Sequence, residues 1–221
     1  MARPALAVMA RVPSAEGKSR LKELLKPEQR EQLQWAFLLD TLDKIKRLPG
    51  FACFVAAAPA ARAGKLKAAV GPEVEVLLQP GGDLGRRMLS VIRQLFQIGY
   101  SPTILIGADV PALPPASLLQ AVKLLERYHL VFGPAMDGGY YLIGMRNPDD
   151  RVFQHIAWGT GSVLRDTLAV CDRHNLTRGL LGCLRDVDRP ADLLALAEEL
   201  KQMEKESVPV RTVKFLQKLL K

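Results

Sequence analysis

The sequence predicts an α/β protein with a mostly parallel central sheet between layers of helices. Short apolar runs alternate along the 221-residue chain with longer segments whose apolar residues recur at helical spacing. Several of these runs end abruptly in loops rich in glycine, proline and charge. The run Thr103–Ile106, for example, is followed after two small residues by Asp109. Because open α/β sheets bind ligands at the carboxyl ends of their strands, we expect the functional residues in such loops.

Composition places the chain among globular proteins. Hydrophobic residues make up 48% of it and charged residues 24%. The length suits one domain, predicted at residues 1–205, followed by a C-terminal segment at 206–221. No apolar run approaches the roughly 18 residues that a membrane-spanning helix needs. Arg11 follows the first apolar run where an export signal would have small residues. Because the three cysteines are far apart in apolar surroundings, we expect free thiols and a cytoplasmic location.

The formal net charge of +8 suits anionic ligands. Lysine and arginine are scattered through helical segments instead of forming a block, so we expect small phosphate-bearing ligands and no nucleic-acid partner. A non-catalytic protein that binds nucleotides or other polyanions is an alternative. It would bind them in a salt-sensitive way without turnover. The sequence carries no signal for an oligomeric state.

The first half of the chain alternates predicted strands and helices. Ala5–Ala10 is a continuous apolar run, which is typical of a buried strand. The segment 27–48 has apolar residues at helical spacing, and Pro27 suits its first turn. Further strands are predicted at 51–57, 74–78 and 103–106, with helices at 59–69 and from the loop after residue 78 to about Ile98.

The second half continues this pattern with one hairpin. Asp137, Gly138 and Gly139 separate two apolar runs, which is a strong turn signal. Helices are predicted at 115–127, 162–173 and 190–205, and strands at 129–133, 140–144 and 180–184. A tail helix from Val210 is expected to pack on the body, with contact to another subunit or to a membrane surface as the alternative. Its basic face would hold Arg211, Lys214, Lys218 and Lys221, and its apolar face Val213, Leu216 and Leu220.

Two loops have the composition of phosphate-binding loops. The loop after the first strand contains Arg11, Lys18 and Arg20, and guanidinium and ammonium groups can hold a diphosphate. It is not a Walker P-loop, because the required first glycine is replaced by Val12. The loop Gln79–Met88 is rich in glycine and enters a helix, where free backbone N–H groups bind anions. The alternatives are a solvated basic loop and, in the second case, a tight turn with Asp83 as helix cap.

Carboxylates at predicted strand ends form a third group. Asp109, Asp186 and Asp188 can bind a divalent cation or cap the helices that follow them. Asp137 would either face Asp109 across a cleft or simply form the hairpin turn. Trp158 is predicted either to fill the core or to stack against a sugar ring.

Five blocks of residues carry a family resemblance. They are Arg11–Pro13 with Gly17–Leu21, Gly82–Met88, Gly107–Leu113, Gly133–Gly144 and Asp186–Leu193. In order and spacing they resemble the DUF2064 family of the GT-A, or nucleotide-diphospho-sugar transferase, superfamily. The chain departs from the family at Ser19, Arg86 and Arg189, where Thr, Glu and Thr are usual. No departure removes a carboxylate.

The resemblance implies a Rossmann-like GT-A fold with three α/β/α layers, a nucleotide held by the first loop and by the loop Gln79–Arg87, and a Mg²⁺ or Mn²⁺ ion on Asp109. Gln79 matches the glutamine that reads the base in similar nucleotidyltransferases. We further predict that Asp186 or Asp188 completes the metal site and that Asp109 and Asp137 are catalytic. The residues predicted in nucleotide binding are Ala10, Arg11, Lys18, Arg20, Gln79, Asp83, Leu84 and Gly85, and those predicted in substrate binding are Asp137, Gly138, Gly139 and Trp158.

The leading hypothesis for the activity is metal-dependent glycosyl transfer from a nucleotide-diphospho-sugar to an unidentified acceptor. The alternative is nucleotidyl transfer, in which a phosphorylated substrate attacks an NTP and pyrophosphate leaves. Phospholactate guanylyltransferases resemble this group and carry a segment similar to Lys18–Leu21. Against this alternative, the first loop lacks the Gly-x-Gly-Thr-Arg pattern of sugar nucleotidyltransferases.

Overall fold

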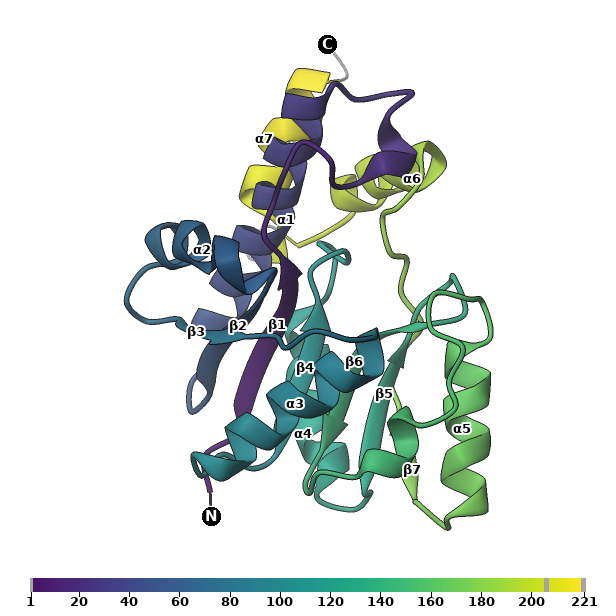
Figure 1. The fold of residues 1–221 in the computed structure, drawn as a ribbon. Coiled ribbons are helices and arrows are strands. Elements are labelled where there is room, and N and C mark those ends of the chain that lie inside the picture. Colours follow the sequence, from purple (N-terminus) through teal and green to yellow (C-terminus); the bar gives the residue numbers. More distant parts are fainter. Residues whose placement is uncertain (1, 205–206, 220–221) are drawn as a thin grey trace.

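The computed structural model describes residues 2–204 and 207–219, and within them seven strands form one sheet (Figure 1). The strand order is β3-β2-β1-β4-β6-β5-β7, and only β6 runs antiparallel to its neighbours. The strands are β1 Ala5–Arg11, β2 Ala52–Ala58, β3 Glu75–Leu78, β4 Thr103–Gly107, β5 Leu130–Pro134, β6 Tyr140–Met145 and β7 Arg178–Leu180.

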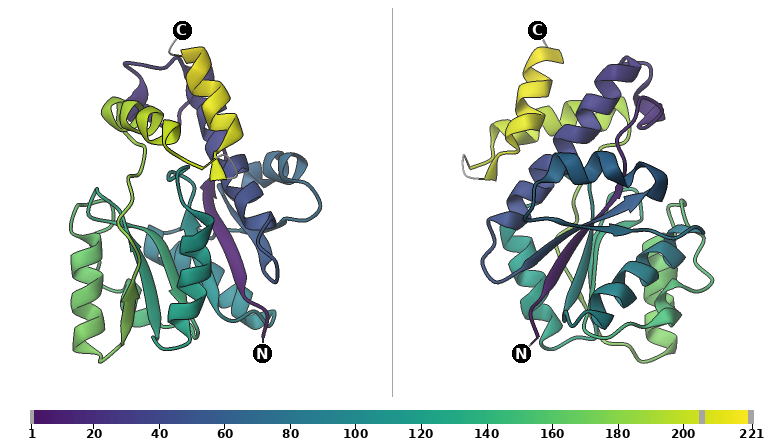
Figure 2. Two further views of the ribbon diagram at one scale, coloured as in Figure 1. Left: turned by 180° about the vertical axis from the view of Figure 1, so that it is seen from behind. Right: turned by 60° about the vertical axis from the view of Figure 1, so that its left-hand side comes forward.

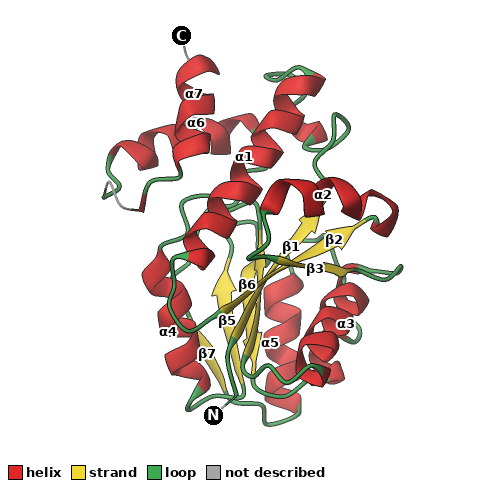
Figure 3. Ribbon diagram, turned by 90° about the vertical axis from the view of Figure 1, so that its left-hand side faces the viewer, coloured by secondary structure: helices red, strands yellow, loops and turns green. Residues whose placement is uncertain are grey.

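Helices cover both faces of this sheet, as Figure 3 shows edge-on. The helices α1, α2 and α4 pack on one face, and α3 and α5 on the other. The predicted three-layer α/β/α architecture is confirmed. No helix of the described residues is long and apolar enough to cross a membrane. The helices are α1 Pro27–Lys46, α2 Ala63–Val70, α3 Leu84–Gln97, α4 Pro115–Leu125, α5 Val163–Arg173, α6 Pro190–Lys201 and α7 Val210–Leu219, with short 3₁₀ helices η1 Ser19–Leu21, η2 Ala60–Arg62 and η3 Asp150–Phe153.

Continuous apolar runs form the central strands because these strands are buried on both faces. In β1, Leu6 and Val8 enter the core beneath α1 and α4, whereas Ala5 and Ala7 enter the core beneath α3. The antiparallel pair of β5 and β6 is the predicted hairpin. The sheet therefore brings the carboxyl ends of β1, β4 and β5 to one edge.

The last strand lies earlier in the chain than predicted. The sequence predicts a strand at 180–184, but only Arg178–Leu180 pairs with β5. Leu181 is buried as the chain leaves the sheet, and Leu184 forms an isolated bridge with Ala135. Leu181 is thus buried although it lies outside the sheet, in a segment that crosses the sheet's edge. The following helix, predicted to reach residue 205, ends at Lys201. Residue 205 itself lies outside the described residues.

A separate group of helices stands above the carboxyl edge (Figure 2). The first half of α1 packs with η1, α6 and α7 around a third apolar cluster that includes Leu21, Phe37 and Leu196. Leu216 of α7 is buried in this cluster, while Lys214 and Lys218 are exposed. Leu220 and Lys221, predicted on the same helix, lie outside the described residues.

Candidate active site at the carboxyl edge of the sheet

Four segments meet at the carboxyl edge: the loop after β1, the loop after β4, the β5–β6 turn and the segment before α6 (Figure 1). Two backbone hydrogen bonds bring the last segment there. Leu184 N donates to Pro134 O at 3.0 Å, and Val187 N donates to Asp109 O at 2.9 Å. Residues far apart in the sequence therefore come together around Asp109.

Lys18 is the centre of this arrangement. It adopts a left-handed backbone conformation with φ 49°. Its Nζ lies 2.8 Å from Asp109 Oδ1, 3.9 Å from Asp188 Oδ1 and 2.6 Å from Val187 O. The Lys18 side chain is 7% exposed and that of Asp109 is 55% exposed. The ammonium is therefore held in place while the carboxylate stays open to a ligand.

Arg20 extends this ion-pair network outward. Its guanidinium forms an ion pair with the Asp188 carboxylate. Of the two acids at the start of α6, Asp188 is thus engaged by Arg20 and approached by Lys18. Asp186 has no ion pair within the described residues.

Asp186 instead lies near a second acid, Asp137. Burial raises the pKa of Asp186, and the negative charge of Asp137 raises it further, while Lys18 acts in the opposite direction. Two neighbouring carboxylates that repel each other are a suitable donor set for a hard divalent cation. However, residues 2–204 and 207–219 contain no group of three or more His, Cys, Asp and Glu side chains arranged to hold a metal. The predicted trio Asp109, Asp186 and Asp188 therefore does not form such a cluster.

The loop after β1 is shaped by α1. Arg30 donates from three nitrogens, to Ala15 O at 2.6 Å, Gly17 O at 3.1 Å and Leu25 O at 3.0 Å. Gln34 donates to Ser14 O at 2.8 Å. The carbonyls of the loop are thus turned toward α1. Sequence reasoning did not identify Arg30, because no motif marks a side chain that binds only main-chain oxygens.

Lys44, also from α1, supports the loop after Asp109. Its Nζ donates to Leu113 O at 3.0 Å and to Pro111 O, and the residue is only 7% exposed. Burial lowers the pKa of Lys44 to about 8, against the opposing influence of Asp40 and Glu199. This residue too was absent from the sequence-based predictions.

The N-terminus of α3 presents a pair of cations. Asp83 caps the helix by accepting from Arg86 N at 2.8 Å, as the capping alternative predicted. Burial lowers the pKa of Arg87, and the positive charge of Arg11 at the end of β1 lowers it further. Two guanidinium groups near a helix N-terminus favour binding of an anion between them.

Gln79 does not have the position that base contact requires. It is buried, and its side-chain amide donates to Ala56 O at 2.6 Å and to Ala10 O at 3.3 Å. Both amide hydrogens thus link β3 to the ends of β1 and β2. This corrects the prediction for Gln79, and it gives buried Ala10 a structural contact through its carbonyl. Leu84, at the start of α3, is partly exposed.

Trp158 is partly buried and packs next to Gly85. A Cβ atom placed on Gly85 would lie 2.6 Å from the indole ring. The ring also stacks on Phe153, with centroids 6.5 Å apart, and meets Tyr140 edge-on. The core alternative therefore describes Trp158 better than sugar stacking, and Gly85 accommodates the indole.

The β5–β6 turn is held by its own residues. Asp137 Oδ1 accepts from Gly139 N at 2.8 Å, and Ala135 N donates to Gly139 O at 3.0 Å. Gly138 has φ +87°, and a Cβ atom there would overlap the main chain of Gly161. The space that a side chain at residue 138 would need is thus filled by the main chain of Gly161. The Asp137 carboxylate itself remains exposed.

Comparison with known proteins places this edge in context. Residues 41–160 match a family described as "Uncharacterized protein conserved in bacteria (DUF2064)". Over 127 residues the chain is 32% identical to the phosphoenolpyruvate guanylyltransferase of Streptomyces coelicolor. That match covers 56% of this chain and 58% of the enzyme, which is less than two thirds of its length.

Solved structures share the whole fold. A crystal structure from Desulfovibrio desulfuricans G20, provisionally named a nucleotide-diphospho-sugar transferase, has a TM-score of 0.91 and 30% identity, and the match covers 99% of this chain and 95% of that one. A CMP:2-keto-3-deoxy-manno-octonic acid synthetase solved with CTP has a TM-score of 0.59 and 12% identity, covering 90% of this chain and 99% of that one. The second likeness concerns the fold alone.

Proposed function

Because the chain belongs to the bacterial DUF2064 family and has the nucleotide-sugar transferase-like fold, we propose that it is a nucleotidyltransferase acting on an NTP and an anionic small molecule. An acceptor oxygen would attack the α-phosphorus of the NTP. The bond between the α-phosphorus and the bridging oxygen would break, and pyrophosphate would leave with the electron pair. The relative from Streptomyces coelicolor is named for a reaction of this class.

One observation carries this proposal: cations gather in two separate groups. Arg11 stands at the end of β1, and its positive charge lowers the pKa of Arg87 in the first turn of α3. Arg20, Lys22 and Arg189 lie at η1 and at the start of α6. A nucleotide-diphospho-sugar with a neutral acceptor requires one such group, whereas a triphosphate with an anionic acceptor requires more positive charge.

The residues then take the following roles. Arg11, Arg87 and the free N–H groups of α3 would hold phosphates of the nucleotide. Lys18, already fixed by three oxygens, would stabilise negative charge that develops on the transferred phosphate without reorganising. An acceptor that is already anionic needs no general base.

A divalent cation fits this chemistry. Asp109 is open to ligands, and the negative charge of Asp137 raises the pKa of Asp186, a repulsion that a bound cation would relieve. Of the two acids before α6, Asp186 is the better candidate ligand because Arg20 engages Asp188. When bound, Mg²⁺ or Mn²⁺ would neutralise phosphate charge as a Lewis acid.

Glycosyl transfer from a nucleotide-diphospho-sugar, the leading hypothesis from the sequence, is the second candidate. The name of the Desulfovibrio relative favours it. So does the exposed Asp137 carboxylate beside Asp186, since a hydroxyl acceptor needs a base.

The test is a product assay with Mn²⁺ and a panel of NTPs and nucleotide-sugars, each with phosphoenolpyruvate and other phosphorylated or carboxylic acids. We expect pyrophosphate release from an NTP, and loss of release in Lys18→Met but not in the exposed-lysine control Lys65→Met. Nucleoside diphosphate release from a nucleotide-sugar would favour glycosyl transfer instead. Nucleotide binding without any turnover would contradict both.

Thermal shift tests the cation separately. Mn²⁺ should raise the melting temperature of the wild type and of the surface control Asp150→Asn, but not that of Asp186→Asn. An equal shift in Asp186→Asn would remove this residue from the metal site.

A further inference from the structure

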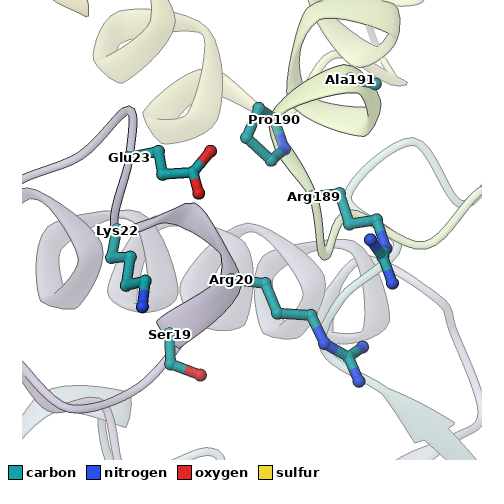
Figure 4. A pocket seen from close by; sticks show the side chains of 7 residues that line it. All are labelled: Ser19, Arg20, Lys22, Glu23, Arg189, Pro190 and Ala191. Atoms are coloured by element: carbon teal, nitrogen blue, oxygen red, sulfur yellow. The ribbon is translucent and has the colours of Figure 1, made fainter.

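A cavity opens between η1 and the start of α6, above the Lys18 network. Its volume is about 620 Å³, which is within the range of small-molecule sites. Ser19, Arg20, Lys22 and Glu23 line one wall, and Arg189, Pro190 and Ala191 line the other (Figure 4). Of these residues, sequence analysis predicted a binding role only for Arg20.

The lining is mostly cationic and partly uncommitted. Three side chains are positive and one, Glu23, is negative. Among the described residues, no carboxylate lies within ion-pair distance of Lys22 or Arg189, whereas Arg20 is paired with Asp188. Figure 4 shows the guanidinium groups of Arg20 and Arg189 reaching the same side of the cavity, away from the Glu23 carboxylate.

The wall formed by α6 is rigid at this point. Asp192 Oδ2 accepts from Arg189 N at 2.7 Å and from Asp188 N at 3.2 Å. The side chains of Arg189 and Ala191 therefore project from a fixed turn. The positive end of the α6 dipole also faces this region, although the Asp192 carboxylate offsets part of it.

We infer that this cavity binds a phosphate-bearing group, either pyrophosphate or a phosphate monoester, of one of the two substrates. The inference rests on the proposed nucleotidyl transfer. Arg20 connects the cavity to the centre of the site, because its partner Asp188 lies 3.9 Å from Lys18 Nζ, which in turn contacts Asp109.

The same chemistry can come from two sources. The cavity receives either the pyrophosphate end of the NTP or the phosphate of the acceptor. In the first case inorganic pyrophosphate competes with NTP. Replacing the cationic side chains of the cavity then weakens binding of the NTP more than binding of the corresponding nucleoside monophosphate. In the second case inorganic phosphate binds in the presence of saturating NTP, and NTP affinity is unaffected by changes in the cavity.

Calorimetry on the full-length protein with inorganic pyrophosphate and phosphate tests the inference. The double variant Lys22→Gln/Arg189→Gln should weaken binding of the better of the two probes about a hundredfold, since losing each of the two charged hydrogen bonds weakens binding about tenfold. Ala191→Glu places a carboxylate in the cavity at a helix N-terminus that tolerates acids, so it should fold and lose binding. The double variant Lys123→Gln/Arg127→Gln, at two exposed positions near the end of α4, removes the same charge as the cavity double variant and should bind as the wild type does.

Unchanged affinity for both probes in the two cavity variants would overturn the inference. A protein that binds neither probe would overturn it as well. Failure of the proposed function shows differently: the wild type would release no pyrophosphate from any NTP, while the binding results with inorganic probes would stand on their own.

Discussion

At the scale of single residues, the most informative side chains are those that bind main-chain carbonyls. Lys44 and Arg30 both extend from α1 to loops of the site. The sequence can indicate Asp109, because a carboxylate directly after a buried strand is unusual. It cannot indicate Lys44 or Arg30, because their partners are carbonyl groups, which every residue has. Charge in a helix is by itself no sign of such contacts.

Lys44 predicts an unusual pH dependence of stability. Its pKa in the folded protein is about 8, below its ordinary value of 10.5. Between these pH values the unfolded chain binds a proton that the folded chain has released, so the free energy of unfolding rises with pH. We expect a rise of about 2 kcal/mol between pH 7.5 and pH 9.5, because a difference of one bound proton contributes at most about 1.4 kcal/mol per pH unit. Urea unfolding of the wild type and of Lys44→Met at pH 7.5 and 9.5 measures it, and the same pH dependence in both proteins would contradict the assignment.

Arg30 predicts a loss of nucleotide affinity. Arg30→Lys keeps the charge but cannot bind the three carbonyls of Ala15, Gly17 and Leu25 together. Because the loop would then lose its fixed shape, we expect the dissociation constant for nucleotide to rise about tenfold. Titration calorimetry measures this. Arg47→Lys at the end of the same helix is the control, and equal affinities of the two variants would show that Arg30 does not shape the loop.

At the scale of elements, burial determines what the sequence predicts well. The strands of the sheet centre are continuous apolar runs, and each appears close to its predicted position. Strand β7 does not, because Leu181 is buried outside the sheet and looks the same in sequence as a strand residue. The glycines of the site behave similarly: Gly85 and Gly138 are needed for packing against protein instead of ligand, a distinction that depends on the tertiary partner.

The docking of α7 on α1 predicts a large effect at Asp40. This carboxylate is 4% exposed and accepts hydrogen bonds from Arg211 N at 3.1 Å, Thr212 N at 2.8 Å and Thr212 Oγ1 at 2.8 Å. Asp40→Asn should lower the free energy of unfolding by about 3 kcal/mol, because the donors of Arg211 and Thr212 would then face a neutral amide instead of a carboxylate. Asp43→Asn weakens partly exposed ion pairs with Arg211 and Lys46 and should cost less than about 1 kcal/mol. Similar costs in urea unfolding would contradict this role for Asp40.

At the scale of the whole molecule, the two tryptophans report on different cores. Trp35 packs against the core on the α1 side of the sheet, and Trp158 against the core on the α3 side. If the chain is one domain, as its length predicts, Trp35→Phe and Trp158→Phe should show coincident unfolding by fluorescence and by circular dichroism. Separate transitions for the two remaining tryptophans would indicate two units that unfold independently.

The contact between Gly85 and Trp158 has a consequence for how α3 is held in place. Gly85 lies in the first turn of α3, and Trp158 belongs to the segment that follows β6. The indole fills the space in which a side chain at residue 85 would lie. A single methyl group there would therefore force α3 and this segment apart. The distance between two segments more than seventy residues apart in the chain thus depends on the absence of one carbon atom.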